Sequence, residues 1–309
     1  MCETMAVKLE LIKDDVRYVH CTNCDLVFVD ESMSDRMIAT MYEEEAERYF
    51  LDHQKIDLDY NVSRYRFEVQ AFRKINFNLS ANILEIGCAT GSFLHLLKGH
   101  GFANLEGIDI SEPSIAFAKK MGLKCESGDF LKMDYQTDFY DCIVMWATLE
   151  HLLHPRLFCE KAFRCLKEGA FLFISVPNYK SVTQRLLGKK NRYVGSGHLN
   201  YFSKSNVSML LTGIGYEVVS TEFHAINPIN IYQDLLGRVN MDSAEFKIKS
   251  QHKAMEIKRR VSSHVALRVL FGLLDGLLNF SGLGDLLIIT ARKTSSNFMR
   301  KDPMSGREG

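Results

Sequence analysis

A short apolar run that breaks at a glycine turn and resumes as a helix-like segment constrains this chain most. Residues 82–94 read Asn-Ile-Leu-Glu-Ile-Gly-Cys-Ala-Thr-Gly-Ser-Phe-Leu. Residues 83–86 have the composition of a buried parallel strand, and residues 93–98 are expected to form a helix. Strand, glycine turn and helix make the first unit of a doubly wound α/β sheet, where ligands bind at the carboxyl ends of the strands.

The spacing of the glycines distinguishes between nucleotide-like ligands. A dinucleotide fingerprint needs a glycine at position 92, which is a serine here. Gly87 and Gly91 are instead four positions apart, with Ala89 between them and Glu85 ahead of them. This resembles motif I of the class I S-adenosylmethionine-dependent methyltransferases, with Ala89 in place of a middle glycine. The resemblance implies S-adenosylmethionine as the cofactor, contacted by Glu85 and by the turn residues Gly87, Cys88, Ala89, Thr90 and Gly91.

Two further acidic residues follow in the order of the same family. Asp109 ends a second predicted strand, 105–110, where a carboxylate can accept hydrogen bonds from ribose hydroxyls; alternatively, it caps the next helix. A third strand, 123–127, leads to Asp129 and Phe130. The resemblance implies that Asp129 meets the adenine amino group and that Phe130 covers the ring, the alternative being a polar turn beside a core aromatic. Ile110 and Trp146, at the ends of two strands, are the remaining implied cofactor contacts.

The remaining strands complete the predicted architecture. Apolar runs at 140–146, 170–178, 216–220 and 285–292 predict further strands. The fold class is therefore α/β, a doubly wound Rossmann-like sheet of seven strands, the last antiparallel as in the resembled family. We expect a partial zinc-ribbon-like hairpin at 1–30, a helical cap at 31–80 and the methyltransferase domain at 81–293. A helical insertion at 240–280 is expected to serve as a cap or a homodimer interface, and a disordered tail to occupy 294–309.

The N-terminal segment carries one Cys-x-x-Cys pair, Cys21 and Cys24. It resembles the second half of a zinc ribbon that precedes some bacterial methyltransferases of this type. Structural zinc needs four ligands, usually from two such pairs, and the sequence adds only Cys2 and the adjacent His20. We therefore expect a truncated ribbon and no metal site. The other five cysteines are expected to be small buried hydrophobic residues.

The chemistry is expected directly after the fourth strand, at Glu150 and His151. Methyl transfer to a hydroxyl is an in-line displacement that benefits from positioning and from a general base. A histidine titrates near neutral pH, and a neighbouring carboxylate orients it. The pair resembles one in quinone-pathway O-methyltransferases, some of which hold a metal with a further glutamate; that position is Ala147 here, so no metal is expected. Alternatively, His151 starts a helix and bonds a backbone carbonyl.

A second candidate base is His198, in a glycine-flanked segment at 195–203 that resembles a loop bordering the substrate cavity in the same family. His198 is expected either to contact the substrate, acting as the base in place of His151, or to pin the loop. The two histidines remain open alternatives from sequence alone.

Composition excludes several classes of partner. The 309 residues are 46% hydrophobic and carry 38 basic and 38 acidic side chains, so no basic surface for nucleic acid is expected. The longest apolar stretch, 269–280, is interrupted by Asp275 and is too short to span a membrane. We see no export signal, and the eight cysteines are expected to be reduced in the cytoplasm.

These observations predict a methyltransferase acting on oxygen of a small molecule or a carbohydrate precursor. Alternatives are methylation at nitrogen or carbon, and a catalytically degenerate protein that binds the cofactor or a partner. An NAD-dependent reductase is disfavoured by the glycine spacing and by the absence of any Tyr-x-x-x-Lys pair.

Overall fold

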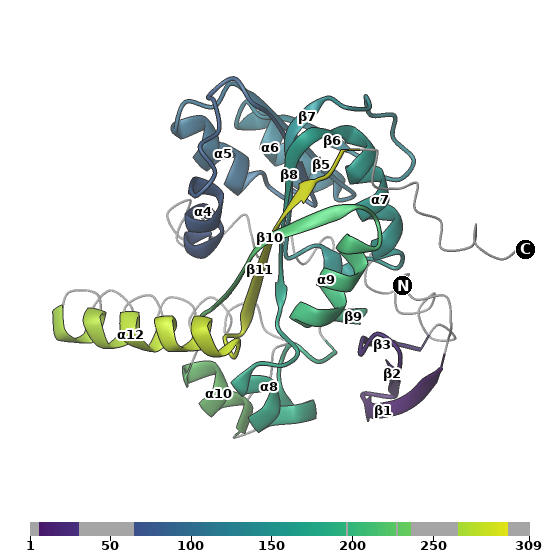
Figure 1. The fold of residues 1–309 in the computed structure, drawn as a ribbon, viewed down its shortest axis with the longest axis vertical. Coiled ribbons are helices and arrows are strands. Elements are labelled where there is room, and N and C mark those ends of the chain that lie inside the picture. The colour runs from purple at the N-terminus through teal and green to yellow at the C-terminus, as the bar shows by residue number, and fades with distance from the viewer. Residues whose placement is uncertain (1–5, 31–64, 196, 227, 236–264, 296–309) are drawn as a thin grey trace, which may run out of the picture.

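A seven-stranded sheet forms the centre of the computed structural model, which describes residues 6–30, 65–195, 197–226, 228–235 and 265–295 (Figure 1). The strand order is β10-β11-β8-β7-β4-β5-β6. β11 pairs antiparallel with both β8 and β10, whereas β8, β7, β4, β5 and β6 pair in parallel. The predicted sheet with its last strand antiparallel is confirmed. Its strands are β4 (Asn82–Ile86), β5 (Asn104–Asp109), β6 (Lys124–Ser127), β7 (Tyr140–Trp146), β8 (Leu166–Pro177), β10 (Tyr216–His224) and β11 (Leu286–Lys293).

Helices cover both faces of this sheet, as a doubly wound fold requires. Successive side chains of a strand point to opposite faces, so Ile83 and Leu84 of β4 join two different hydrophobic cores. The core that contains Ile83 is closed by α4 (Arg66–Arg73), α5 (Ser92–Gly99) and α6 (Glu112–Lys120). The core that contains Leu84 is closed by α7 (Pro155–Cys165) and α9 (Lys204–Thr212).

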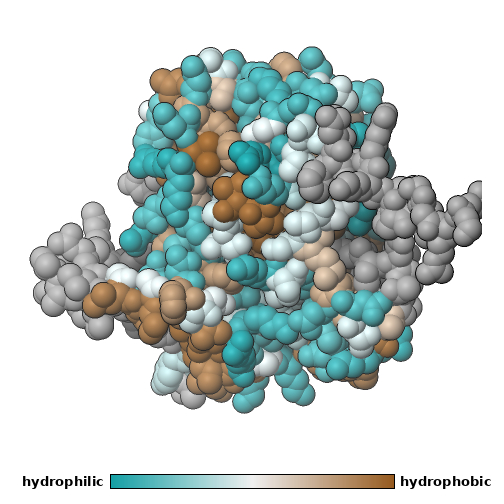
Figure 2. Space-filling view, in the orientation of Figure 1, coloured by the Kyte–Doolittle hydropathy of each residue, from teal (hydrophilic) through white to brown (hydrophobic). Residues whose placement is uncertain are grey.

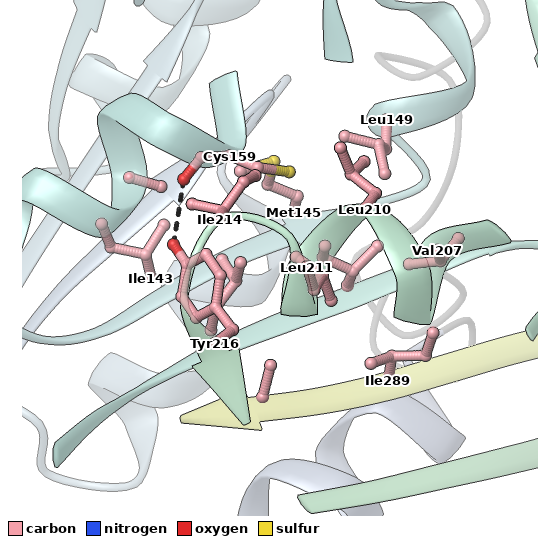
Figure 3. Packing of buried hydrophobic residues seen from close by; sticks show 14 of the residues in the cluster. Ile143, Met145, Leu149, Cys159, Val207, Leu210, Leu211, Ile214, Tyr216 and Ile289 are labelled. Carbon is pink, nitrogen blue, oxygen red and sulfur yellow. Dashed lines mark hydrogen bonds between the residues drawn. The ribbon is translucent and has the colours of Figure 1, made fainter. Parts of the chain in front are cut away.

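Figure 3 shows the packing beneath α7 and α9. Leu210 and Leu211 of α9 are buried in one cluster with Ile289 of β11. Tyr216, at the start of β10, donates its hydroxyl to the carbonyl oxygen of Cys159 at 3.0 Å. Burial raises the pKa of Tyr216 well above its usual value. The polar end of this buried tyrosine is therefore neutral and hydrogen-bonded, as a close-packed core requires.

A separate small sheet joins three N-terminal strands to one strand from much later in the chain. Its strands are β1 (Val7–Lys13), β2 (Val16–Cys21), β3 (Val27–Val29) and β9 (Asn200–Tyr201). β1 and β2 pair antiparallel, which confirms the predicted hairpin. Cys21 and Cys24 are both buried among apolar side chains. No group of three or more potential metal ligands includes them within the described ranges, and Cys2 lies outside those ranges. A zinc ribbon is therefore not seen in the part of the chain that the structure describes.

Further helices extend from the carboxyl ends of the strands (Figure 1). They are α8 (Val182–Leu187), α10 (Pro228–Leu235) and α12 (Val265–Ser281), with short 3-10 helices η2 (Leu149–His151) and η3 (Gly188–Lys190). Most of the predicted cap at 31–80, much of the insertion at 240–280 and nearly all of the tail lie outside the described residues, so those boundaries remain predictions. None of the described helices is both long and apolar enough to cross a bilayer.

Candidate functional site

The glycine turn after β4 has a conformation that explains its sequence. Gly87, Ala89 and Gly91 all have positive φ angles, of 75°, 47° and 75°. A Cβ on Gly87 would lie 2.4 Å from Oγ1 of Thr148, and one on Gly91 would lie 2.5 Å from Cδ1 of Leu123. Gly87 and Gly91 are therefore required both by their backbone angles and by close neighbours, whereas position 89 accommodates a methyl group.

Asp109 connects this turn to the next helix. Its Oδ2 accepts a hydrogen bond from the backbone N–H of Ala89 at 2.8 Å, and its Oδ1 accepts one from Ser111 at 2.9 Å. Burial raises the pKa of Asp109, and these backbone hydrogen bonds oppose the shift. The cap of α6 is Ser111, whose side chain accepts from the N–H of Ser114. Asp109 is therefore the residue that fixes the glycine turn against the end of β5.

The predicted contacts near the adenine differ in their exposure. Ile110 is exposed at the end of β5. Asp129 is partly exposed, and its Oδ1 accepts a hydrogen bond from the N–H of Leu131 at 2.9 Å. Phe130 instead lies in the hydrophobic core, with its ring centroid 5.2 Å from that of Tyr135. The position of Phe130 is the one expected of a core aromatic, the alternative left open by the sequence.

The other predicted cofactor residues are buried at the ends of β4 and β7. Trp146 packs edge-on against Phe93 with centroids 5.3 Å apart, and its indole N–H has no hydrogen-bond partner within the described part of the chain. Glu85, Cys88 and Thr90 are also buried. The buried indole N–H of Trp146 is a polar group that a ligand could satisfy.

The three predicted catalytic residues come together just beyond β7. Nδ1 of His151 lies 3.0 Å from the carbonyl oxygen of Gly197, and Nε2 of His151 lies 4.0 Å from Oε1 of the buried Glu150. The rings of His151 and His198 are 4.7 Å apart, centre to centre, and meet edge to face. One potential ligand atom from each of Glu150, His151 and His198 lies within 4.8 Å of the others, an arrangement that could hold a metal ion.

The two histidines have different environments. His198 is buried, and its ring stacks on that of Tyr193 at 6.0 Å with 5° between the planes. Burial, together with the neighbouring His151, lowers the pKa of His198 well below its usual value, opposed by a hydrogen bond to the backbone of Tyr193. His151 is about one-third exposed, with a side-chain accessibility of 35%. His198 is therefore the neutral, inner histidine and His151 the solvent-facing one.

The loop that carries His198 is anchored by hydrogen bonds to the N-terminal sheet and to the segment around η2. Leu199 donates its N–H to the carbonyl of Glu150 at 2.8 Å, and its own carbonyl accepts the N–H of Val29 at 2.9 Å. The amide of Asn200 donates to the carbonyl of Leu152 at 2.7 Å. The N-terminal sheet and η2 therefore fix the loop from two sides.

Sequence analysis did not identify three residues that shape this site: Thr148, Tyr193 and Gly197. Oγ1 of Thr148 lies 3.2 Å from the carbonyl oxygen of Ile86, which links the ends of β7 and β4. Tyr193 and Gly197 supply the ring stacking and the carbonyl described above. Thr148 could have been indicated only by its place directly after the fourth strand, and Gly197 by its place beside His198 in the glycine-flanked segment; no local pattern marks Tyr193.

Comparison with known proteins is consistent with this geometry. A family model described as a methyltransferase domain matches residues 60–221. The ubiquinone biosynthesis O-methyltransferase of Coxiella burnetii is 25% identical over 175 residues, covering 48% of this chain and 74% of that protein.

Two solved structures share the fold. A possible histamine N-methyltransferase from Thermotoga maritima superposes with a TM-score of 0.54 at 18% identity, covering 84% of this chain and 100% of that one. An S-adenosylmethionine-dependent methyltransferase from Archaeoglobus fulgidus gives 0.52 at 20% identity, covering 79% and 99%. Because the family model spans more than half of the chain, this protein belongs to the methyltransferase-domain family and is an S-adenosylmethionine-dependent methyltransferase.

Proposed function

We propose that this enzyme methylates a hydroxyl oxygen of a small molecule, with His151 as the general base. The observation that carries the proposal is the hydrogen bond between His151 Nδ1 and the carbonyl oxygen of Gly197. A carbonyl oxygen can only accept, so Nδ1 must carry the proton, and Nε2 of the neutral ring is then the atom that can accept another. The O-methyltransferase from Coxiella burnetii, a relative by sequence, supports oxygen as the acceptor atom.

The cofactor is proposed to bind across the glycine turn and Asp109. Each oxygen of Asp109 accepts one backbone hydrogen bond, and a carboxylate oxygen retains capacity for a second, so the ribose hydroxyls fit here. The exposed Ile110 side chain and the partly exposed Asp129 carboxylate suit an adenine ring and its amino group. When bound, S-adenosylmethionine supplies a methyl group activated by a sulfonium. The glycine turn, Asp109 and Asp129 would hold and orient the cofactor.

On the acceptor side, the chain's own residues would manage the proton. Nε2 of His151 accepts the hydroxyl proton while an oxygen lone pair forms the new bond to the methyl carbon, and the electron pair of the broken carbon–sulfur bond remains on sulfur. The carboxylate of Glu150, 4.0 Å away, stabilises the imidazolium that results. His198 is a weaker base because its pKa is lowered, so we assign it the role of packing against His151 and shaping the acceptor pocket. A carbohydrate precursor remains an acceptor class to be tested beside phenols.

The test is turnover of a hydroxyl acceptor found by screening phenols and glycan precursors for S-adenosylhomocysteine release. His151→Gln should lower turnover by about 10²-fold or more, since general-base catalysis contributes that much. His198→Gln, the matched control, should lower it less. If His151→Gln retains activity within about twofold of the wild type, a margin well below a base's usual contribution, the proton is accepted elsewhere.

A metal-assisted version of the reaction is a second candidate. Glu150, His151 and His198 can bring three ligand atoms together, and each imidazole also bonds a backbone carbonyl or amide group, of Gly197 or Tyr193. Such outer hydrogen bonds orient metal-bound histidines. Chelator treatment separates the candidates: loss of turnover that a divalent metal restores favours the metal, and unchanged turnover favours the base.

A further inference from the structure

The helix α12 is attached to the body of the protein along one side. Oδ2 of Asp275 lies 3.0 Å from Nδ1 of His224, and Oδ1 of Asn279 accepts the N–H of Phe223 at 2.8 Å. Leu278 is buried between these contacts. Positions 275, 278 and 279 lie on one side of a helix, so this side is the one docked on β10.

The opposite side of α12 exposes large apolar side chains. Leu273 is 68% exposed, Leu277 61% and Phe280 92%. These residues are spaced by four and three positions, so they form one stripe, and at about 100° per residue that stripe faces away from the docked side. Isolated exposed leucines are ordinary on a protein surface, but a continuous apolar stripe that includes an almost fully exposed phenylalanine indicates a binding surface.

The stripe continues onto two neighbouring helices. Figure 2 shows hydrophobic surface along α12 and on the helices below it. Leu186 of α8 is 65% exposed, and Tyr232 and Leu235 of α10 are 63% and 52% exposed. The backbone N–H of Val182, at the start of α8, donates to the carbonyl of Leu283, just after α12, at 3.0 Å. We call the six residues Leu186, Tyr232, Leu235, Leu273, Leu277 and Phe280 the apolar patch.

The exposed charges on α8 and η3, beside the apolar patch, are positive. Arg185, Lys189 and Lys190 are exposed on α8 and η3. Segments 178–195, 228–235 and 272–285 contain three acidic residues, and each of these carboxylates is engaged within the protein. They pair as Asp234 with Arg192, Asp275 with His224 and Asp285 with Thr183.

We propose that the apolar patch and its basic rim dock this enzyme on the surface of an anionic phospholipid membrane. An amphipathic helix that lies in the membrane plane buries its apolar side at the level of the headgroups, and nearby lysines and arginines bind anionic lipids. α12 is not long and apolar enough to cross the bilayer, which fits a helix lying flat. A second copy of this chain is disfavoured as the occupant, because a two-fold axis through the patch would bring two basic rims together.

The docking surface lies at the edge of the sheet that also carries the candidate site. α8 follows the carboxyl end of β8 after four residues, and α12 docks on His224 at the carboxyl end of β10. Glu150 and His151 follow the carboxyl end of β7, which runs parallel to β8. Membrane docking would therefore bring this edge of the sheet toward the lipid.

The test is co-sedimentation of the full-length protein with vesicles. Vesicles of equal parts phosphatidylcholine and phosphatidylglycerol should bind the protein, and pure phosphatidylcholine should bind it more weakly. Leu273→Ser/Leu277→Ser/Phe280→Ser should lower the affinity by about tenfold or more, because each substitution removes a large apolar side chain that docking would bury in the lipid. Arg185→Gln/Lys189→Gln/Lys190→Gln should lower the affinity for anionic vesicles by about fivefold per charge removed. Added salt should also lower this affinity, because it screens the attraction between the basic residues and the lipid.

A triple variant at other exposed apolar positions, Leu79→Ser/Leu157→Ser/Met209→Ser, serves as the control and should bind vesicles as the wild type does. Circular dichroism verifies that all variants are folded. The proposal is overturned if the wild type does not sediment with anionic vesicles, or if the α12 variant binds as well as the control. It is also overturned if light scattering shows a dimer that only the α12 substitutions dissociate, since the occupant would then be a second copy.

Discussion

The glycine turn and the histidine cluster lie at the same edge of the sheet but are built in different ways. The turn is held through its own backbone N–H groups, which donate to the carbonyl of Ile108 and to the carboxylate of Asp109 on the neighbouring strand. The cluster depends on contacts such as that between His151 and Gly197, 46 residues apart. A site built from backbone conformation can be recognised in the sequence by a local pattern of glycines and acidic residues. A site built from tertiary contacts appears in the sequence only as isolated residues that share no pattern.

This difference predicts different responses to substitution. Changes in the turn should affect folding and cofactor binding together, because the same backbone serves both. Changes in the cluster should affect chemistry while leaving the fold and the cofactor affinity nearly unchanged.

The largest effect on stability is expected from Gly87→Ala. The new Cβ would meet Oγ1 and Cγ2 of Thr148 at 2.4 and 2.6 Å, and the φ of 75° disfavours any side chain. We expect the free energy of unfolding to fall by about 2–4 kcal/mol, measured by urea denaturation.

A double variant tests the cause of that loss. Thr148→Ala removes both clashing atoms, so Gly87→Ala/Thr148→Ala should lose less stability than the sum of the single changes. Strictly additive losses would show that Thr148 is not the obstacle.

A smaller, pH-dependent effect is expected at His224, outside both regions. Burial lowers the pKa of His224, but the hydrogen bonds that its ring donates to the carboxylates of Glu222 and Asp275 outweigh it, so the pKa is raised; Lys74 also pairs with Glu222. Charged His224 thus stabilises the fold below its unfolded pKa of about 6.5, and this contribution is lost as the pH rises through the folded value. The difference in melting temperature between wild type and His224→Gln should be larger near about pH 6 than near about pH 9. A difference that grows with pH would contradict the assignment.

The smallest effect is expected from Ala89→Gly, at the position of the family's middle glycine. Glycine relieves the positive φ of Ala89, a gain of about 1–2 kcal/mol, but increases the entropy of the unfolded chain by an opposing 0.4–1 kcal/mol, roughly. Thermal unfolding should show a change of at most about 1 kcal/mol, toward greater stability. Marked destabilisation would mean that the methyl group of Ala89 contributes packing that its backbone angle does not indicate.

Much of the fold could be predicted from the sequence because each strand carries its own apolar run and because the motifs resemble those of class I methyltransferases, which implies the arrangement of the sheet. The surroundings of Phe130 and His151 could not, since both depend on which neighbours the tertiary structure supplies. Phe130 packs against Tyr135 in the core, and His151 bonds the Gly197 carbonyl, the alternative left open beside the base. The pairing of β3 with β9, which anchors the His198 loop, joins segments about 170 residues apart and leaves no local pattern.

Calorimetric titration with S-adenosylhomocysteine tests most directly whether the glycine turn binds the cofactor and the histidine cluster serves the chemistry instead. The wild type, Asp109→Asn and His151→Gln would be compared under one set of conditions. Asp109→Asn should weaken binding by about tenfold or more, because it removes a charged acceptor, and His151→Gln should bind within about twofold of the wild type, since a base contributes to chemistry instead. Unchanged affinity in Asp109→Asn, or an equal loss in both variants, would contradict the account.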